Sequence, residues 1–158
     1  MCGRRAMKAV VRPLEGTCSE GDLLKLRIRV RPHDAKGYDT KWQSRLLCWS
    51  GTHPLADQMH RWVVATEEGE VVGHLAAQPQ FYRISHQRVV AHTPADYMVL
   101  PGYGFHAITL MRKFFRTCEN CVACDAAPAA IGVETGLGAE ESGGLQHAAK
   151  PLKYSPHG

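Results

Sequence analysis

The chain has 158 residues, of which 44% are hydrophobic and 22% are charged, and its formal net charge is +4. This length and composition are typical of one soluble globular domain with a sizeable core. The mild positive charge suits an anionic small ligand, but no run of Lys and Arg marks a surface that would bind nucleic acid, so we expect no such partner. We also expect no membrane contact, because no apolar stretch approaches the roughly 18 residues of a spanning helix.

The first 16 residues include basic side chains but neither the apolar core nor the cleavage site of a signal peptide. We therefore expect a cytoplasmic protein, in which the six cysteines are reduced thiols. We expect residues 1–8 to be flexible, residues 9–145 to form one domain, and residues 146–158 to be a poorly ordered tail or an incomplete final strand.

The N-terminal part predicts a strand and a helix. Residues 9–14 have the pattern of a short opening strand. Ser19 followed by Asp22 predicts a capped helix start, and we expect the helix to run to about Arg29 before Pro32 ends it.

Three arginines of this helix, Arg27, Arg29 and Arg31, are expected to form a basic side. We interpret that side as a solvated face, and the alternative is a wall that receives an acidic acceptor. The apolar residues between Trp42 and Trp49 predict a second short helix.

Two hairpins are predicted in the middle of the chain. The first has strands over residues 62–65 and 70–75 around Glu67-Glu68-Gly69, and the second has strands over residues 81–84 and 88–91 around Ser85-His86-Gln87. We expect the tip of the second hairpin to be solvated.

A buried strand, a glycine turn and an amphipathic helix are predicted next, over residues 96–100, 101–104 and 105–116. The apolar face of the helix comprises Ala107, Ile108, Met111, Phe114 and Phe115, and its last turns carry Arg112, Lys113 and Arg116. Free N–H groups at a helix start, together with the helix dipole, favour an anion. We therefore interpret this turn as a site for a pyrophosphate.

Residues 128–139 predict a further helix that ends in glycines. The order of elements predicts an α/β fold with a mixed, mostly antiparallel central sheet flanked by helices. No internal repeat is present.

Three of these segments, taken in order, resemble the GNAT superfamily of acyl-CoA N-acyltransferases. Residues 62–75 are similar to that family's second and third strands, residues 96–112 to its cofactor-binding strand, loop and helix, and residues 129–140 to its next helix. The resemblance extends over residues 9–145. It implies an N-acetyltransferase that moves an acyl group from acetyl-CoA to a primary amine of a small molecule or peptide by direct attack.

The resemblance also implies where the cofactor binds. The strand would separate from its neighbour so that the backbone of Tyr97, Met98 and Val99 pairs with the pantetheine arm, with the Val99 N–H as the oxyanion donor. The pyrophosphate would lie on the backbone of the turn and helix start, namely Gly102, Tyr103, Gly104, Phe105, His106 and Ala107.

Direct attack needs a base for the amine proton and an acid for the thiolate. The candidate bases are Asp96 and His92, with His74 as a further possibility, and the candidate acid is Tyr103, with Tyr97 as an alternative. The tyrosine that commonly serves as acid in the family falls at Glu134, which has a proton to give at neutral pH only if its pKa is raised.

The turn lacks the arginine that is usual in the family's loop and is about two residues shorter. An alternative function is therefore a catalytically silent acyl-CoA-binding protein. A second alternative is a metal-binding module built on Cys118, Cys121 and Cys124, but these cysteines lack a fourth ligand, and we expect structural thiols and no metal. A homodimer is possible.

Overall fold

The structure is a computed structural model that describes residues 8–33, 39–124 and 127–143. The predictions of a flexible segment before residue 8 and of a poorly ordered tail or final strand over 146–158 lie outside these residues. Within the described ranges, no helix has both the length and the apolar character needed to cross a membrane.

A four-stranded sheet forms the centre of the fold, and its strands lie in the order β1-β2-β3-β4. The strands are β1 (Ala9–Pro13), β2 (His60–Thr66), β3 (Val71–Ile84) and β4 (Gln87–Val99). Each neighbouring pair is antiparallel, and the parallel pairing in the described part of the chain is an isolated bridge between His92 and Cys121. The predicted α/β class with a mostly antiparallel sheet is therefore confirmed.

The long strands β3 and β4 each comprise two segments that the sequence analysis predicts as separate strands. The segments 70–75 and 81–84 belong to β3, and the segments 88–91 and 96–100 belong largely to β4. Each strand contains a proline near its middle, Pro79 in β3 and Pro94 in β4. The backbone nitrogen of Pro79 faces away from β4, and the pairing of β3 with β2 has already ended at Ala77. The backbone nitrogen of Pro94 faces the outer edge of β4. Neither proline therefore removes a hydrogen bond between strands.

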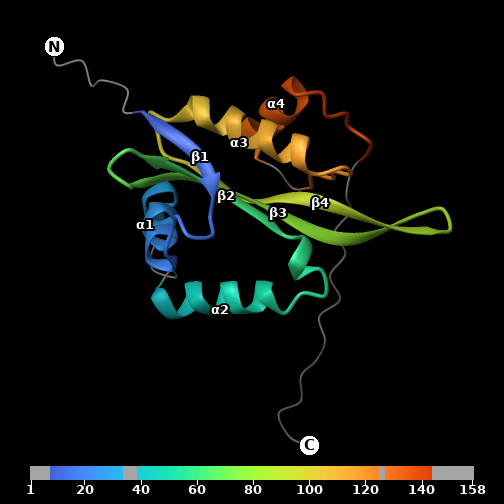
Figure 1. Ribbon diagram of the computed structural model, residues 1–158. Coiled ribbons are helices and arrows are strands. Elements are labelled where there is room, and N and C mark those ends of the chain that lie inside the picture. The colour runs from blue at the N-terminus through green and yellow to red at the C-terminus, as the bar shows by residue number, and fades with distance from the viewer. Residues whose placement is uncertain (1–7, 34–38, 125–126, 144–158) are drawn as a thin grey trace, which may run out of the picture.

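Helices cover both faces of the sheet (Figure 1). On one face lie α1 (Glu20–Val30) and α2 (Thr40–Gly51), and on the other lie α3 (Gly104–Thr117) and α4 (Pro128–Gly136). The short helix η2 (Ala56–Gln58) leads into β2. The two predicted N-terminal helices and the two predicted C-terminal helices are thus present, and the hairpin of β3 and β4 extends beyond the helices (Figure 1).

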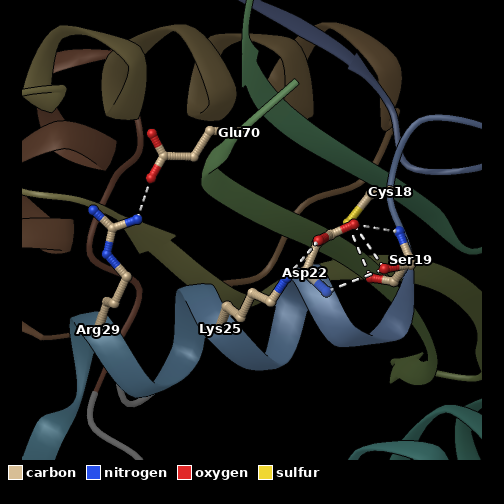
Figure 2. Close-up of polar contacts among 6 residues, drawn as sticks. All are labelled: Cys18, Ser19, Asp22, Lys25, Arg29 and Glu70. Carbon is tan, nitrogen blue, oxygen red and sulfur yellow. Dashed lines mark hydrogen bonds and ion pairs between the residues drawn. The ribbon is translucent and has the colours of Figure 1, made fainter. Parts of the chain in front are cut away.

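A complete capping box fixes the start of α1 (Figure 2). The Ser19 hydroxyl accepts a hydrogen bond from the Asp22 N–H at 3.2 Å, and the Asp22 carboxylate accepts one from the Ser19 N–H at 3.1 Å. These bonds satisfy donors that a helix start otherwise leaves free. Further along the helix, Arg29 forms an exposed ion pair with Glu70 at the β2–β3 turn (Figure 2).

The predicted basic side of α1 does not exist as a single face. Arg27 lies four residues after Leu23, on the buried stripe of the helix, whereas Arg29 lies on the exposed side. The interpretation of Arg27 as a solvated residue is therefore wrong, and its partner, Asp96, is described below.

The core fills the space between the sheet and both helix layers. From α3 it receives Leu110, Met111 and Phe114, all fully buried, and from α1 it receives Leu23 and Leu26. The predicted apolar face of α3 is thus correct at its centre, but Ile108 remains 38% exposed, and Phe105, in the first turn, is 76% exposed.

Candidate functional site

An irregularity in β4 lies where the predicted cofactor-binding segment begins, and it includes the predicted base Asp96. The register with β3 shifts between His74, which pairs with Met98, and Ala76, which pairs with Ala95. Asp96, at the shift, has a φ of +53°. Aspartate tolerates this left-handed conformation better than most residues. The extra residue is a β-bulge, which bends the strand and redirects its side chains.

The bulge also changes which backbone groups of β4 face outward. Before it, His92 turns its N–H and C=O away from β3, to Asn120 and Val122. After it, Leu100 donates to Val72 of β3, so the alternating pattern turns the backbone of Tyr97 and Val99 outward. Within the described residues no strand pairs with that part of the edge. The outer edge is therefore covered at His92 and open at Tyr97 and Val99.

The open edge leads into the glycine turn and the start of α3. Gly102 has a φ of +92°, a conformation that favours glycine. Tyr103 donates to Leu100 and His106 donates to Tyr103, whereas the N–H groups of Gly102, Gly104 and Phe105 have no acceptor in the described part of the chain. An added Cβ at Gly102 or Gly104 would meet nothing within 4 Å, so these amides lie at an open surface.

A buried ion pair lies on the other side of the bulge. The Arg27 guanidinium donates through two nitrogens to the two carboxylate oxygens of Asp96, and its Nε is 3.4 Å from Oε1 of the buried Gln43. The Arg27 side chain is 4% exposed and that of Asp96 is 23% exposed. The ring of Trp42 lies 5.0 Å from the guanidinium carbon. Asp96 is therefore held in a fixed orientation by a residue 69 positions away in the sequence.

His74 completes this buried group. Its Nδ1 lies 2.9 Å from the backbone oxygen of Asp96 and 3.4 Å from a carboxylate oxygen of the same residue. Since a carbonyl can only accept, Nδ1 carries the hydrogen, and Nε2 has no partner within the described residues. Burial lowers the pKa of His74. The charge of Asp96 and the hydrogen bond to its backbone oppose this shift of the pKa, whereas the charges of Arg27 and Arg61 add to it. The imidazole is thus neutral at neutral pH.

A cavity of about 210 Å³ lies between this group and the helices α1 and α2. Its floor is one face of the sheet and its roof is mainly α2. The floor comprises Arg61, His74, Ala76, Gln78, Ala95 and Asp96, and the roof comprises Leu23, Gln43, Leu46, Leu47, Trp49, Ser50 and Met59. Because of the bulge, the consecutive residues Ala95 and Asp96 both line it. The sequence did not predict this cavity, although the position of Arg27 on the apolar stripe of α1 was a signal for a buried partner.

The structure does not bring His92 together with Asp96. His92 pairs with Pro79, and Ala95 pairs with Ala76, so the alternation along β3 places His92 on the opposite face of the sheet from the cavity. There its Nε2 lies 3.0 Å from the backbone oxygen of Gln58, and its ring lies 5.7 Å from that of His60.

The aromatic candidates for the acid lie on the α3 side. Tyr97 donates from its hydroxyl to the Ala107 backbone oxygen at 2.7 Å, and burial, followed by the charge of Glu134, raises the pKa of Tyr97 to about 12. Burial likewise raises the pKa of Glu134, which is 5% exposed on α4. Tyr103 lies at the N-cap of α3, partly exposed, with its ring 6.3 Å from His106.

The three clustered cysteines lie near the end of α3 and the bridge to β4. Burial raises the pKa of Cys118 to about 12, Cys121 donates weakly to the Cys118 backbone oxygen at 3.4 Å, and Cys124 is exposed. Among the described residues, no group of three or more His, Cys, Asp or Glu side chains is placed to hold a metal ion.

Comparison with known proteins places the fold. No family model matches the sequence, and no curated protein matches it. Solved structures do match over nearly the whole chain. The aminoglycoside antibiotic 6'-N-acetyltransferase AAC(6')-Ih of Acinetobacter baumannii has a TM-score of 0.64 at 16% identity, covering 92% of this chain and 100% of its own.

Two further matches are of the same kind. Glucosamine-6-phosphate N-acetyltransferase of Arabidopsis thaliana has a TM-score of 0.63 at 12% identity, covering 90% of this chain and 98% of its own. A predicted acetyltransferase of Clostridium acetobutylicum, solved with acetyl-CoA, has a TM-score of 0.56 at 12% identity, covering 90% and 96%. The chain has the fold of the GNAT superfamily of N-acetyltransferases.

Proposed function

We propose that this protein transfers an acetyl group from acetyl-CoA to a primary amine of a small molecule or peptide. One observation carries the proposal: the open backbone edge of β4 at Tyr97 and Val99 leads directly into the unpaired amides of Gly102, Gly104 and Phe105. An extended polar chain that ends in a pyrophosphate is complementary to such a surface, because an edge strand offers alternating donors and acceptors and a helix start offers donors alone.

In this proposal the pyrophosphate of acetyl-CoA lies at the turn, beside Tyr103, His106 and Ala107, and the pantetheine arm runs back along β4 past Met98. The amide of Val99 faces the arm. The amide of Tyr97 lies farther from the turn and nearer the cavity, so we propose that it donates to the thioester oxygen in place of the Val99 amide expected from the sequence.

The reaction is a direct attack. The lone pair of the neutral amine forms the N–C bond, and the C=O electron pair moves to oxygen, where the outward amide stabilises the charge. The nitrogen then gives one proton to a base, the oxyanion re-forms the carbonyl, and the C–S bond breaks with its electron pair leaving on sulfur. Protonation of the thiolate completes the exchange, which yields the N-acetyl amine and CoA.

Of the two predicted bases, Asp96 lines the cavity and His92 does not, so we propose Asp96 as the base. Tyr103, the predicted acid, lies at the turn beside the proposed pyrophosphate, at the opposite end of the pantetheine arm from the thiolate, so we propose that solvent protonates the thiolate. Because Arg27 already engages both oxygens of Asp96, we expect the amine to react mainly in its neutral form. The rate is therefore expected to rise with pH through the pKa of the acceptor amine.

The test begins with binding. Acetyl-CoA should raise the thermal unfolding midpoint of the wild-type protein, and release of the CoA thiol should follow when a panel of primary amines is added. Gly104→Glu should abolish the thermal shift, because it places a carboxylate at the proposed pyrophosphate site. The open space around Gly104 and the favourable position of an acid at a helix start should leave the fold intact.

Gly21→Glu is the matched control, since Gly21 also lies in the first turn of a helix, α1, and meets only the Ser19 hydroxyl, at 3.7 Å. It should keep wild-type affinity. Unchanged affinity in Gly104→Glu would remove the turn from the site. A thermal shift without thiol release for any amine would favour the alternative of a silent acyl-CoA-binding protein.

A further inference from the structure

Arg61 is the one Arg or Lys on the floor of the larger cavity among the described residues. Its register with Ala76 places it on the face of the sheet that looks toward α2, and it lines both the cavity of about 210 Å³ and a neighbouring one of about 110 Å³. It forms no ion pair in the described part of the chain. Glu15 lines only the smaller cavity and also has no ion pair there.

The other charged or titratable groups around the larger cavity cancel or are neutral. Asp96 is a lining residue, but its charge is offset by Arg27, which is buried beside it. His74 is held as a neutral imidazole by burial, which lowers its pKa. The remaining lining is polar but uncharged, or apolar, with Leu46, Trp49 and Met59 among the apolar residues. The cavity therefore combines an apolar wall with one net positive charge.

From this balance of charge we propose that the acceptor amine carries its own anionic group, a carboxylate or a phosphate, which Arg61 binds while the apolar roof covers the rest of the molecule. This inference rests on the proposed function and names the substrate class of the same site. A guanidinium pairs with carboxylate or phosphate in a bidentate geometry and stays charged at all relevant pH values. A polycationic acceptor would need unpaired carboxylates, and the described lining offers none.

The size of the cavity indicates a small molecule. Its volume of about 210 Å³ corresponds to roughly seven molecules of liquid water. This is enough for a compound of the size of an amino acid, whose anionic group would bind Arg61 while its amine lies on the side of the bulge at Asp96. A free amino acid or a small amino-phosphate fits this description better than a protein N-terminus.

The test uses three acceptors with the same benzyl group: L-phenylalanine, L-phenylalaninamide and 2-phenylethylamine. L-phenylalaninamide lacks the negative charge of L-phenylalanine, and its α-amine is weakly basic. A preference for L-phenylalanine over this amide would therefore report recognition of the anion and not a difference in amine basicity. With wild-type protein and acetyl-CoA, kcat/KM for L-phenylalanine should exceed that for the amide by about tenfold or more, as expected for a charged hydrogen-bonded pair. Arg61→Gln should remove this preference while retaining the KM for acetyl-CoA.

Arg83→Gln is the control, since it removes the same charge from an exposed position on the β3–β4 hairpin, and it should keep the preference. Binding supplies a readout that needs no turnover: N-acetyl-L-phenylalanine should stabilise the wild type more than N-acetyl-2-phenylethylamine, and Arg61→Gln should equalise the two. Equal binding of these compounds to the wild type, or a preference for the uncharged acceptors, would overturn the inference even if the protein is an acetyltransferase. If anion-dependent binding is present but no amine releases CoA thiol, the proposed function fails and the anion site stands.

Discussion

The ion pair between Arg27 and Asp96 makes a quantitative prediction about stability. Removing one partner of a buried pair leaves an uncompensated charge, which costs about 3–5 kcal/mol, whereas replacing both partners is often nearly neutral. Asp96 is 23% exposed and Arg27 is 4% exposed. We therefore expect Arg27→Met, which removes the guanidinium from Asp96, to cost about 3 kcal/mol, and Asp96→Asn, which removes the carboxylate charge from Arg27, to cost about 4 kcal/mol.

The double variant Arg27→Met with Asp96→Asn should cost only about 1–2 kcal/mol, far below the sum of the single effects, because neither charge remains. Asparagine is the suitable replacement since it also tolerates the left-handed conformation at position 96. Urea unfolding followed by circular dichroism gives the four free energies. The single Arg27→Met change should lower the thermal midpoint by roughly 6–12 °C for a chain of this size.

The exposed pair of Arg29 and Glu70 provides the control, because its side chains are 53% and 43% exposed. Arg29→Met should cost about 0–1 kcal/mol, and the double variant with Glu70→Gln should show almost no coupling. Additive losses for Arg27 and Asp96 would contradict the reasoning, since they would mean that the two charges do not compensate each other. The double variant also distinguishes a loss of stability from a loss of catalysis. If Asp96 is the base, the double variant should be inactive although most of its stability is restored.

Two further predictions concern packing and pH. Gly73→Ala should destabilise the protein by about 1–3 kcal/mol in urea unfolding, because the new Cβ would lie 3.0 Å from Cγ2 of Val64, whereas Gly132→Ala in α4 has open space and should stabilise it by roughly 1 kcal/mol. A gain for Gly73→Ala would refute the close contact. The lowered pKa of His74 means that the unfolded chain binds a proton at this residue more readily than the folded chain does. Stability is therefore fully present above the ordinary histidine pKa of 6.5, and it is lost as the pH falls below that value toward the folded-state pKa. Thermal midpoints measured between about pH 7.5 and pH 5 should therefore fall less steeply in His74→Gln than in the wild type, and equal slopes would exclude His74 as the source.

Local signals in the sequence were sufficient to place most elements of the fold. The capping box at Ser19 gave the start of α1, and Glu67-Glu68-Gly69 gave the first hairpin, because both depend on hydrogen bonds between near neighbours in the chain. The continuity of β3 through Pro79 and of β4 through Pro94 was missed. A strand continues through a proline where the proline nitrogen faces away from the partner strand. That direction is set by the register with another strand and is not encoded locally.

The candidate site was predicted on one side only. The turn and helix start at Gly102 and Gly104 could be read from the sequence, since their amides are free for local reasons. The cavity could not, because its floor and roof come from strands and helices distant in sequence, and the pairing of Arg27 with Asp96 exists only in the folded chain. Arg27 on the apolar stripe of α1 indicated a buried partner but not its identity.

The bulge at Asp96 explains why the open edge of β4 and the cavity, the two parts of the proposed site, meet at one place. An extra residue in β4 exchanges the inward and outward directions of the backbone, so Tyr97 and Val99 face the open edge. The same residue turns two successive side chains, Ala95 and Asp96, toward the cavity. A regular strand could not provide both arrangements, because its side chains alternate between the two faces of the sheet in step with the alternation of its backbone groups between the two edges. Arg27 and His74, which hold Asp96 from α1 and β3, therefore stabilise both the open edge and the cavity face of β4 by fixing a single backbone conformation.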